Sequence, residues 1–142
     1  MKLSAMLLAN CACARIRNAS RVITRVYDDF LRDAGLKASQ VAVLAAVDAS
    51  EQGSITELSQ ALLMDRTTLS RNLRPLVVQG LVTLGAEGWR RSKTIHITPA
   101  GQARLKAVLP LWKQAQDDLV RRLGEKRWNK MHAELQAVIA AY

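Results

Sequence analysis

Apolar residues recur at spacings of three and four through most of the chain, which is the pattern of amphipathic helices. This pattern predicts helices over residues 3–34, 40–49, 57–62, 67–79, 99–123 and 125–142. Residues 82–84 and 93–97 are instead rich in Val, Thr and Ile, which favours two strands joined by a loop over 85–92. The predicted fold class is therefore mainly α with a small β-hairpin.

Residues that favour helix ends stand at several of these borders. Three glycines follow predicted helices, where a C′ residue is often a glycine: Gly35, Gly80 and Gly124. Ser39 and Thr56 are predicted N-caps, because a side-chain oxygen at that position accepts a hydrogen bond from the first turn. Thr98 followed by Pro99 combines an N-cap with the residue favoured at the first helical position. The predicted borders thus rest on end signals as well as on periodicity.

The size and charge of the chain narrow its class. Its 142 residues suit one domain, or one domain with dimerisation arms, and 49% of them are hydrophobic. The formal net charge is +9 and the pI is about 10.3, which favours an anionic partner, most often a nucleic acid. The sequence has no run of about 18 apolar residues, so we expect no membrane span and no membrane partner.

The N-terminal segment loosely resembles a signal peptide, with Lys2 ahead of an apolar stretch over residues 5–9. That stretch is shorter than the roughly 7–15 apolar residues of a signal sequence, and Arg15 follows closely. We therefore expect a helix here and a cytoplasmic protein. The two cysteines, Cys11 and Cys13, make no disulfide framework and suit a reducing compartment.

The predicted helix over 67–79 has the two faces that a DNA-reading helix needs. A helix that enters the major groove is anchored on one side and is short, polar and cationic on the other. The apolar face consists of Leu69, Leu73, Leu76 and Val77. The polar face and the helix entrance carry Arg66, Thr67, Thr68, Ser70, Arg71 and Arg74. Arginine can bond guanine or phosphate through two parallel hydrogen bonds, and small hydroxyls allow close approach.

The predicted hairpin adds a second cationic element. It carries Arg90, Arg91 and Lys93 beside Trp89, a cluster that can reach the adjacent minor groove or the DNA backbone. An arginine-bearing helix face is by itself typical of any solvated helix. The order helix, turn, helix, strand, basic loop, strand is much more specific, and it predicts a winged helix-turn-helix that binds double-stranded DNA.

The terminal helices carry more apolar residues than a lone surface helix needs. These are Leu3, Met6, Leu7 and Leu8 near the start, Leu105, Val108, Leu109, Leu111, Trp112, Leu119, Val120 and Leu123 in the long helix, and Trp128, Met131, Leu135, Val138 and Ile139 in the last. One alternative is that these residues complete the hydrophobic core of a monomer. A small winged domain has too little surface to cover all of them, so we expect a homodimer that buries them between two copies. The expected division is an N-terminal dimerisation arm over 1–34, a DNA-binding domain over 35–100 and C-terminal dimerisation helices over 101–142.

Two segments carry a family resemblance. Residues 54–82, SITELSQALLMDRTTLSRNLRPLVVQGLV, and 95–101, IHITPAG, resemble the MarR family of bacterial transcriptional regulators, and the likeness covers nearly the whole chain. It implies a homodimer with interleaved terminal helices that binds a pseudo-palindromic operator as a repressor and is released by a small molecule or an oxidant. The wing of that family often carries Asp-x-Arg, whereas this chain has Trp89, Arg90 and Arg91, so the Asp is missing.

The first helix resembles the organic-hydroperoxide-sensing branch of that family. This resemblance implies that Cys13 is oxidised and that Tyr27 bonds to it, with a thiolate as the reactive species. Arg15 and Arg17 are close enough in sequence to stabilise a thiolate. Other tyrosines of that sensor are absent, because Arg17 and Ala38 occupy their positions. The alternative is that Cys13 is a small buried hydrophobic residue, as free cysteine commonly is.

Two hypotheses from other classes stay open. In the first, Cys11 and Cys13 form a thiol-based module that binds a metal or an arsenical, or that acts in redox chemistry. Residues two apart on one helix point about 200° from each other, which argues against both thiols binding one ion. In the second hypothesis, the protein is a basic protein–protein adaptor that uses the same fold but binds no DNA. The sequence offers no general base, oxyanion donors or nucleotide loop, and His96 and His132 lack a ligand pattern, so we expect no enzyme, cofactor or metal.

Overall fold

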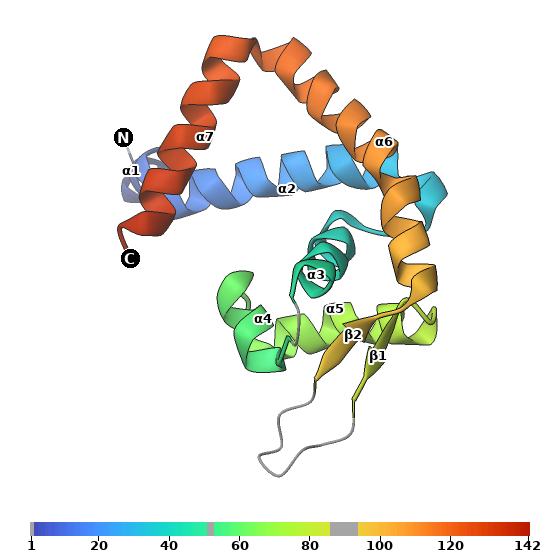
Figure 1. Cartoon of the computed structure of the whole chain (residues 1–142). Helices are drawn as coiled ribbons and strands as arrows, with labels where there is room; N and C mark the ends of the chain where they lie inside the picture. Colours follow the sequence, from blue (N-terminus) through green and yellow to red (C-terminus); the bar gives the residue numbers. More distant parts are fainter. Residues whose placement is uncertain (1, 51–52, 86–93) are drawn as a thin grey trace.

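Helices form most of the computed structural model, which describes residues 2–50, 53–85 and 94–142. The elements are α1 (Leu3–Asn10), α2 (Ala12–Leu31), a 3₁₀ turn η1 (Arg32–Ala34), α3 (Ala38–Ala49), α4 (Ile55–Ala61), α5 (Arg66–Val78), β1 (Val82–Leu84), β2 (Ile95–Ile97), α6 (Pro99–Leu123) and α7 (Glu125–Ala140). Helices α2, α6 and α7 enclose a triangle in projection, and α3, α4, α5 and the two strands lie below it (Figure 1). The mainly α fold with one small β-hairpin is confirmed.

The strands form an antiparallel pair below the start of α6. Val82 pairs with Ile97 and Leu84 with Ile95. An isolated bridge between Ser54 and Thr94 ties the pair to the start of α4. The chain thus runs helix, turn, helix, strand, strand, which is the order of a winged helix-turn-helix.

The hydrophobic core lies between α3, α5, the sheet and the start of α6. Its fully buried side chains come from the end of α2, from α3, α5 and both strands, and from the turn before β1: Leu31, Val43, Leu44, Val47, Leu69, Leu76, Leu81, Val82 and Ile95. Because α5 contributes two of them and the sheet two more, burial of apolar area fixes α5 and the sheet to the same core.

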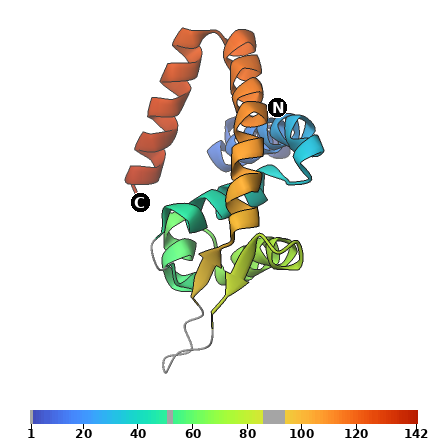
Figure 2. The same cartoon turned by 45° about the vertical axis from the view of Figure 1, so that its right-hand side comes forward.

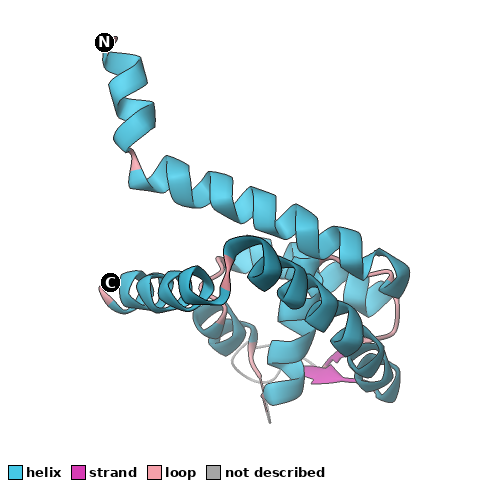
Figure 3. Ribbon diagram, turned by 90° about the horizontal axis from the view of Figure 1, so that it is seen from above, coloured by secondary structure: helices cyan, strands magenta, loops and turns pink. Residues whose placement is uncertain are grey.

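The terminal helices stand apart from this core. Helix α1 extends beyond the start of α2 when the molecule is seen from above (Figure 3), and α7 runs back downward from its junction with α6 in the rotated view (Figure 2). Neither α1 nor α7 buries a residue, and most of their large apolar side chains are exposed: Leu3, Met6, Leu7, Leu8, Leu135, Val138 and Ile139. Among the described residues, no helix has the length and apolar character needed to cross a bilayer.

The prediction of one continuous helix over 3–34 is wrong at Cys11. The backbone there is extended (φ −77°, ψ 110°), and the chain starts a new helix at Ala12. The Cys11 sulfur accepts a hydrogen bond from the Ala14 N–H at 3.5 Å, as an N-cap does. The Arg15 guanidinium donates to the Ala9 carbonyl, with Nε at 2.9 Å, and so satisfies an oxygen that the break frees.

Two predicted N-caps are also displaced. Helix α3 begins at Ala38, ahead of Ser39, because the Asp28 carboxylate accepts from the Ala38 N–H at 2.7 Å. Helix α4 is capped by Ser54 rather than Thr56, since Ser54 and Glu57 form a reciprocal capping box. The other end signals are confirmed: the φ angles of Gly35, Gly80 and Gly124 lie between 68° and 81°, and Thr98 accepts from the Gly101 N–H at 3.0 Å ahead of Pro99.

Candidate nucleic-acid interface

Helix α5 is fixed to the core along one side. Leu69 and Leu76 are 0% exposed and Leu73 is 4% exposed. Val77, predicted on the same face, is instead exposed, because it lies at the edge of the contact and faces β1. Three buried leucines at i, i+4 and i+7 are enough to hold the helix while its other side stays free.

The start of α5 is held by Asp65. Its carboxylate accepts from the Thr68 N–H at 2.8 Å and from the Thr68 hydroxyl at 2.7 Å. These bonds, first the backbone one and then the side-chain one, hold the pKa of the Asp65 carboxyl below its usual value. The ionised cap also suits the positive end of the helix dipole. Thr68, a predicted DNA contact, therefore has a partner within its own helix.

The Asp65 cap gives a pH-dependent prediction. Because the folded pKa is depressed, its contribution to stability is complete above the unfolded pKa of about 3.9 and is lost as the pH falls through the folded value. We expect Asp65→Ala to melt at a lower temperature than the wild type at pH 7, and this difference to shrink below about pH 4.

Asp65→Asn is the matched control, since it keeps the capping oxygen without the charge. Thermal melts of the three proteins across pH test the prediction. A difference between wild type and Asp65→Ala that stays constant down to pH 2 would show that the charge of the cap contributes nothing to stability.

Arg66 joins the two helices of the motif. Its guanidinium Nη2 donates to the Thr56 hydroxyl at 2.7 Å, which links the first turn of α5 to the first turn of α4. Arg66 therefore braces the helix pair in the free protein. The remaining predicted contacts on α5 are all exposed, namely Thr67, Ser70, Arg71 and Arg74.

A shallow hollow separates α5 from the first strand. Its volume is about 260 Å³, and Ser70 and Arg74 line it together with Val77 and Leu84. Ser70 and Arg74 thus face the strand side of α5. The predicted contacts Arg90, Arg91 and Lys93, with Trp89, fall outside the described residues.

The end of α5 is fixed to α6 through the turn at Gly80. The Thr98 hydroxyl donates to the Gly80 carbonyl at 2.6 Å, and the Thr98 N–H donates to the Leu81 carbonyl at 3.0 Å. Gly101 packs directly against the same Leu81 carbonyl. Both ends of α5 are therefore bonded to neighbouring elements, which restrains the helix that would face DNA.

The predicted sensor residues do not meet within one chain. Cys11 and Cys13 are exposed, and Tyr27 is half-buried, with its pKa raised above the usual value by burial. Cys13 and Tyr27 lie on the same helix, and the 14 residue steps from one to the other span about 21 Å of its axis. Within the described residues, no group of three or more His, Cys, Asp or Glu side chains could hold a metal ion.

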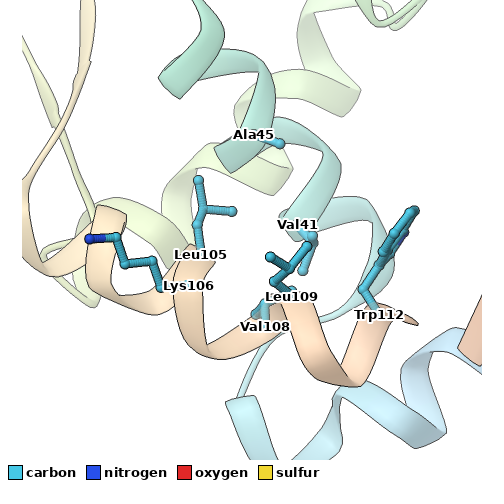
Figure 4. Close-up of a pocket in the computed structure, with 7 residues that line it drawn as sticks. All are labelled: Val41, Ala45, Leu105, Lys106, Val108, Leu109 and Trp112. Atoms are coloured by element: carbon cyan, nitrogen blue, oxygen red, sulfur yellow. The ribbon is translucent and has the colours of Figure 1, made fainter. Parts of the chain in front are cut away.

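An apolar pocket that the sequence could not locate lies between α3 and α6. Its volume is about 380 Å³, and its lining residues, drawn in Figure 4, are Val41, Ala45, Leu105, Lys106, Val108, Leu109 and Trp112. A second hollow of about 470 Å³ adjoins it on the α2 side and shares Val41, Ala45 and Trp112. The half-exposed Trp112 on a long amphipathic helix was the one signal in the sequence, but it was assigned to dimer packing.

A helix pair, a fixed and polar recognition helix, and a two-stranded wing define a winged helix-turn-helix protein. Comparison with known proteins agrees with this class. A family model described as MarR family matches residues 34–92. No curated protein sequence matches significantly.

Solved structures resemble the chain over nearly its full length. The Mycobacterium tuberculosis transcriptional regulator MosR is 33% identical, with 95% of this chain and 99% of MosR covered and a TM-score of 0.78. MosR in complex with DNA is 35% identical, with coverages of 93% and 98% and a TM-score of 0.78. The repressor CouR, bound to a 23-mer DNA duplex, has a TM-score of 0.81 over 98% of this chain and 99% of CouR, but at 21% identity it shows the fold alone.

The chain belongs to the MarR family of DNA-binding transcriptional regulators. The resemblance inferred from residues 54–82 and 95–101 is thereby confirmed. Proteins of this family are regulators rather than enzymes.

Proposed function

We propose that this regulator is a homodimeric repressor that places α5 in the major groove of a pseudo-palindromic operator. The observation that carries the proposal is the two-sided character of α5, which is buried along its leucines and exposed along its arginines and hydroxyls. Such a helix can approach base edges without any loss of packing. The proposed DNA contacts are Arg66, Thr67, Thr68, Ser70, Arg71, Arg74, Arg90, Arg91 and Lys93.

The exposed apolar faces of α1 and α7 support the dimer. A second copy is the partner that buries identical faces symmetrically. In this proposal residues 1–34 and 101–142 dimerise, residues 35–100 bind DNA, and two copies of α5 lie about 34 Å apart on the duplex. The protein acts in the cytoplasm, where its DNA is and where its exposed thiols stay reduced.

Selection of genomic DNA fragments by the purified protein tests this function. We expect enrichment of one palindromic sequence, and an affinity that falls steeply with rising salt because bound phosphates release counterions. The preference for the palindrome over random DNA should persist at every salt concentration. Binding without sequence preference would contradict the operator-specific repressor, and no DNA binding at any salt concentration would favour the adaptor hypothesis.

The pocket between α3 and α6, with the adjoining hollow against α2, is the proposed site for a small-molecule effector. Its walls are almost wholly apolar, and Lys106 lies at its edge (Figure 4). An apolar molecule with an anionic group suits these walls, because it would bury its apolar part and keep its charge near the ammonium. The pocket joins an arm helix to a helix of the winged group, so its occupant would contact both units.

An oxidant is the second proposed effector, and the break at Cys11 supports it. Because Cys11 stands outside α2 in extended backbone, it and Cys13 do not lie on opposite sides of one regular helix. We propose that an organic hydroperoxide oxidises one thiolate to a sulfenic acid and leaves as an alcohol. The other thiol then attacks that sulfur, which forms a disulfide and releases water. The disulfide would remove the Cys11 cap and change the α1–α2 junction.

Serine variants distinguish this pair from a sensor that uses Cys13 alone. We expect hydroperoxide to release the wild type from its operator and a dithiol reductant to restore binding. Both Cys11→Ser and Cys13→Ser should lose the response. Release of Cys11→Ser but not Cys13→Ser would instead favour Cys13 acting alone, with Tyr27 of a second copy as the proposed partner. Release of both variants would show that neither thiol is the switch.

A further inference from the structure

A single arginine nitrogen bridges the end of an arm helix and the end of the recognition helix. Arg104 lies on the second turn of α6 and is half-buried. Its Nη1 donates to the Ala34 carbonyl at 2.8 Å and to the Gln79 Oε1 at 3.2 Å. These two acceptors belong to segments that are 45 residues apart in the sequence (34 to 79).

Each acceptor marks the end of an element that matters for DNA binding. Ala34 closes η1, which continues α2, and Gly35 then turns the chain at φ 68°. Gln79 is the C-cap of α5, where its own N–H bonds back to the Pro75 carbonyl. Arg104 therefore connects three elements, α2–η1, α5 and α6, at one point.

We propose that Arg104 is a positioning residue that sets the angle of the recognition helix against the arm, and thereby the operator affinity. The proposal rests on the function proposed above, in which α5 reads DNA. A charged donor bound to two oxygens resists displacement more strongly than a neutral hydrogen bond does. With the Thr98 bonds to the same turn, it fixes where the end of α5 lies.

The hydrogen bonds of Arg104 lie next to the apolar pocket in the sequence of α6. Leu105 and Lys106, the next residues of α6, line that pocket, and Val41 of α3 lies across it. A molecule that separates α6 from its neighbours would therefore shift Arg104 relative to Ala34 or to Gln79. The bridge gives such a shift a direct route to the end of α5.

Arg104→Met tests the proposal, because methionine keeps most of the apolar stem and removes both hydrogen bonds. With the operator fragment selected by the wild type, we expect about a tenfold loss of affinity. The slope of log affinity against log salt should not change, since a residue that touches no phosphate releases no counterions. Lys113→Met, an exposed cation lost from the same helix, is the matched control and should keep wild-type affinity.

A double-mutant cycle with Gln79→Leu separates positioning from folding. Gln79 is exposed, so its replacement should leave the fold intact and still cut the bond to α5. We expect Gln79→Leu to lose affinity, and Arg104→Met with Gln79→Leu to lose no more than Arg104→Met alone, because the two residues act through one bond.

Three outcomes would overturn the proposal. They are wild-type affinity in Arg104→Met, a salt slope reduced by about one, which indicates a direct phosphate contact, and additive losses in the cycle. A wild type without operator preference would instead contradict the proposed function itself, so the two failures are distinguishable.

Discussion

Gly101→Ala should lower the free energy of unfolding by about 3 kcal/mol, because the added methyl group would overlap backbone. A Cβ at this position would overlap the Leu81 carbonyl oxygen and lie 2.7 Å from Ile97 Cγ1. The oxygen cannot yield cheaply, because it is backbone and already accepts the Thr98 N–H. Relief therefore requires α6 to move away from the sheet and from the end of α5.

Thermal or denaturant unfolding measures this effect, and a drop of roughly 10 °C in the melting temperature corresponds to it. Gly80→Ala is the matched control. Its φ is 68°, but nothing lies within 4 Å of a Cβ there, so only the left-handed backbone penalty of about 1 kcal/mol applies. If both variants lose the same stability, close packing at Gly101 is not what requires glycine.

Local signals in the sequence predicted the elements that depend on neighbouring residues. Thr98 and Pro99 start α6, and Gly80 and Gly124 end helices, as their chemistry predicts. Local signals did not decide between two possible N-cap residues close together in the sequence. Ser54 caps α4 where Thr56 was expected, because Glu57 completes a capping box only with Ser54.

Features held by side chains that reach beyond their own helical turn were not predictable. The break at Cys11 is stabilised by the Arg15 side chain, which reaches back to the Ala9 carbonyl, and periodicity carries no sign of it. The Arg104 bridge joins residues up to 70 positions apart. Its sequence signal is only an arginine on an amphipathic helix, which is typical of any solvated face.

The sequence predicted which residues lie on the exposed side of α5. It did not predict which of them brace the motif and which are free to contact DNA. Periodicity identified α5 and its leucine face, because burial follows helical spacing. It did not separate Arg66, which bonds Thr56, and Thr68, which bonds Asp65, from residues without such ties. A side chain that braces the motif must give up its partner before it can contact DNA, so we expect Arg71 to contribute more to affinity than Arg66 does.

Arg71→Ala should weaken operator binding by about 10- to 100-fold, which is the range for loss of one bidentate arginine contact to guanine. Arg71 is exposed near the middle of α5, between the buried Leu69 and Leu73, so its removal should leave the core intact. Arg127→Ala is the control, because it removes the same charge near the start of α7, at the opposite end of the molecule from α5 (Figure 1).

Binding to a set of single-base operator variants shows what Arg71 contacts. If it reads a base, Arg71→Ala binds the variants at one operator position equally well, while discrimination at the other positions persists. If it contacts phosphate, all sequences weaken alike and the salt slope falls by about one. Unchanged affinity, with Arg127→Ala also unchanged, would remove Arg71 from the interface and leave the other proposed contacts on α5 as the candidates.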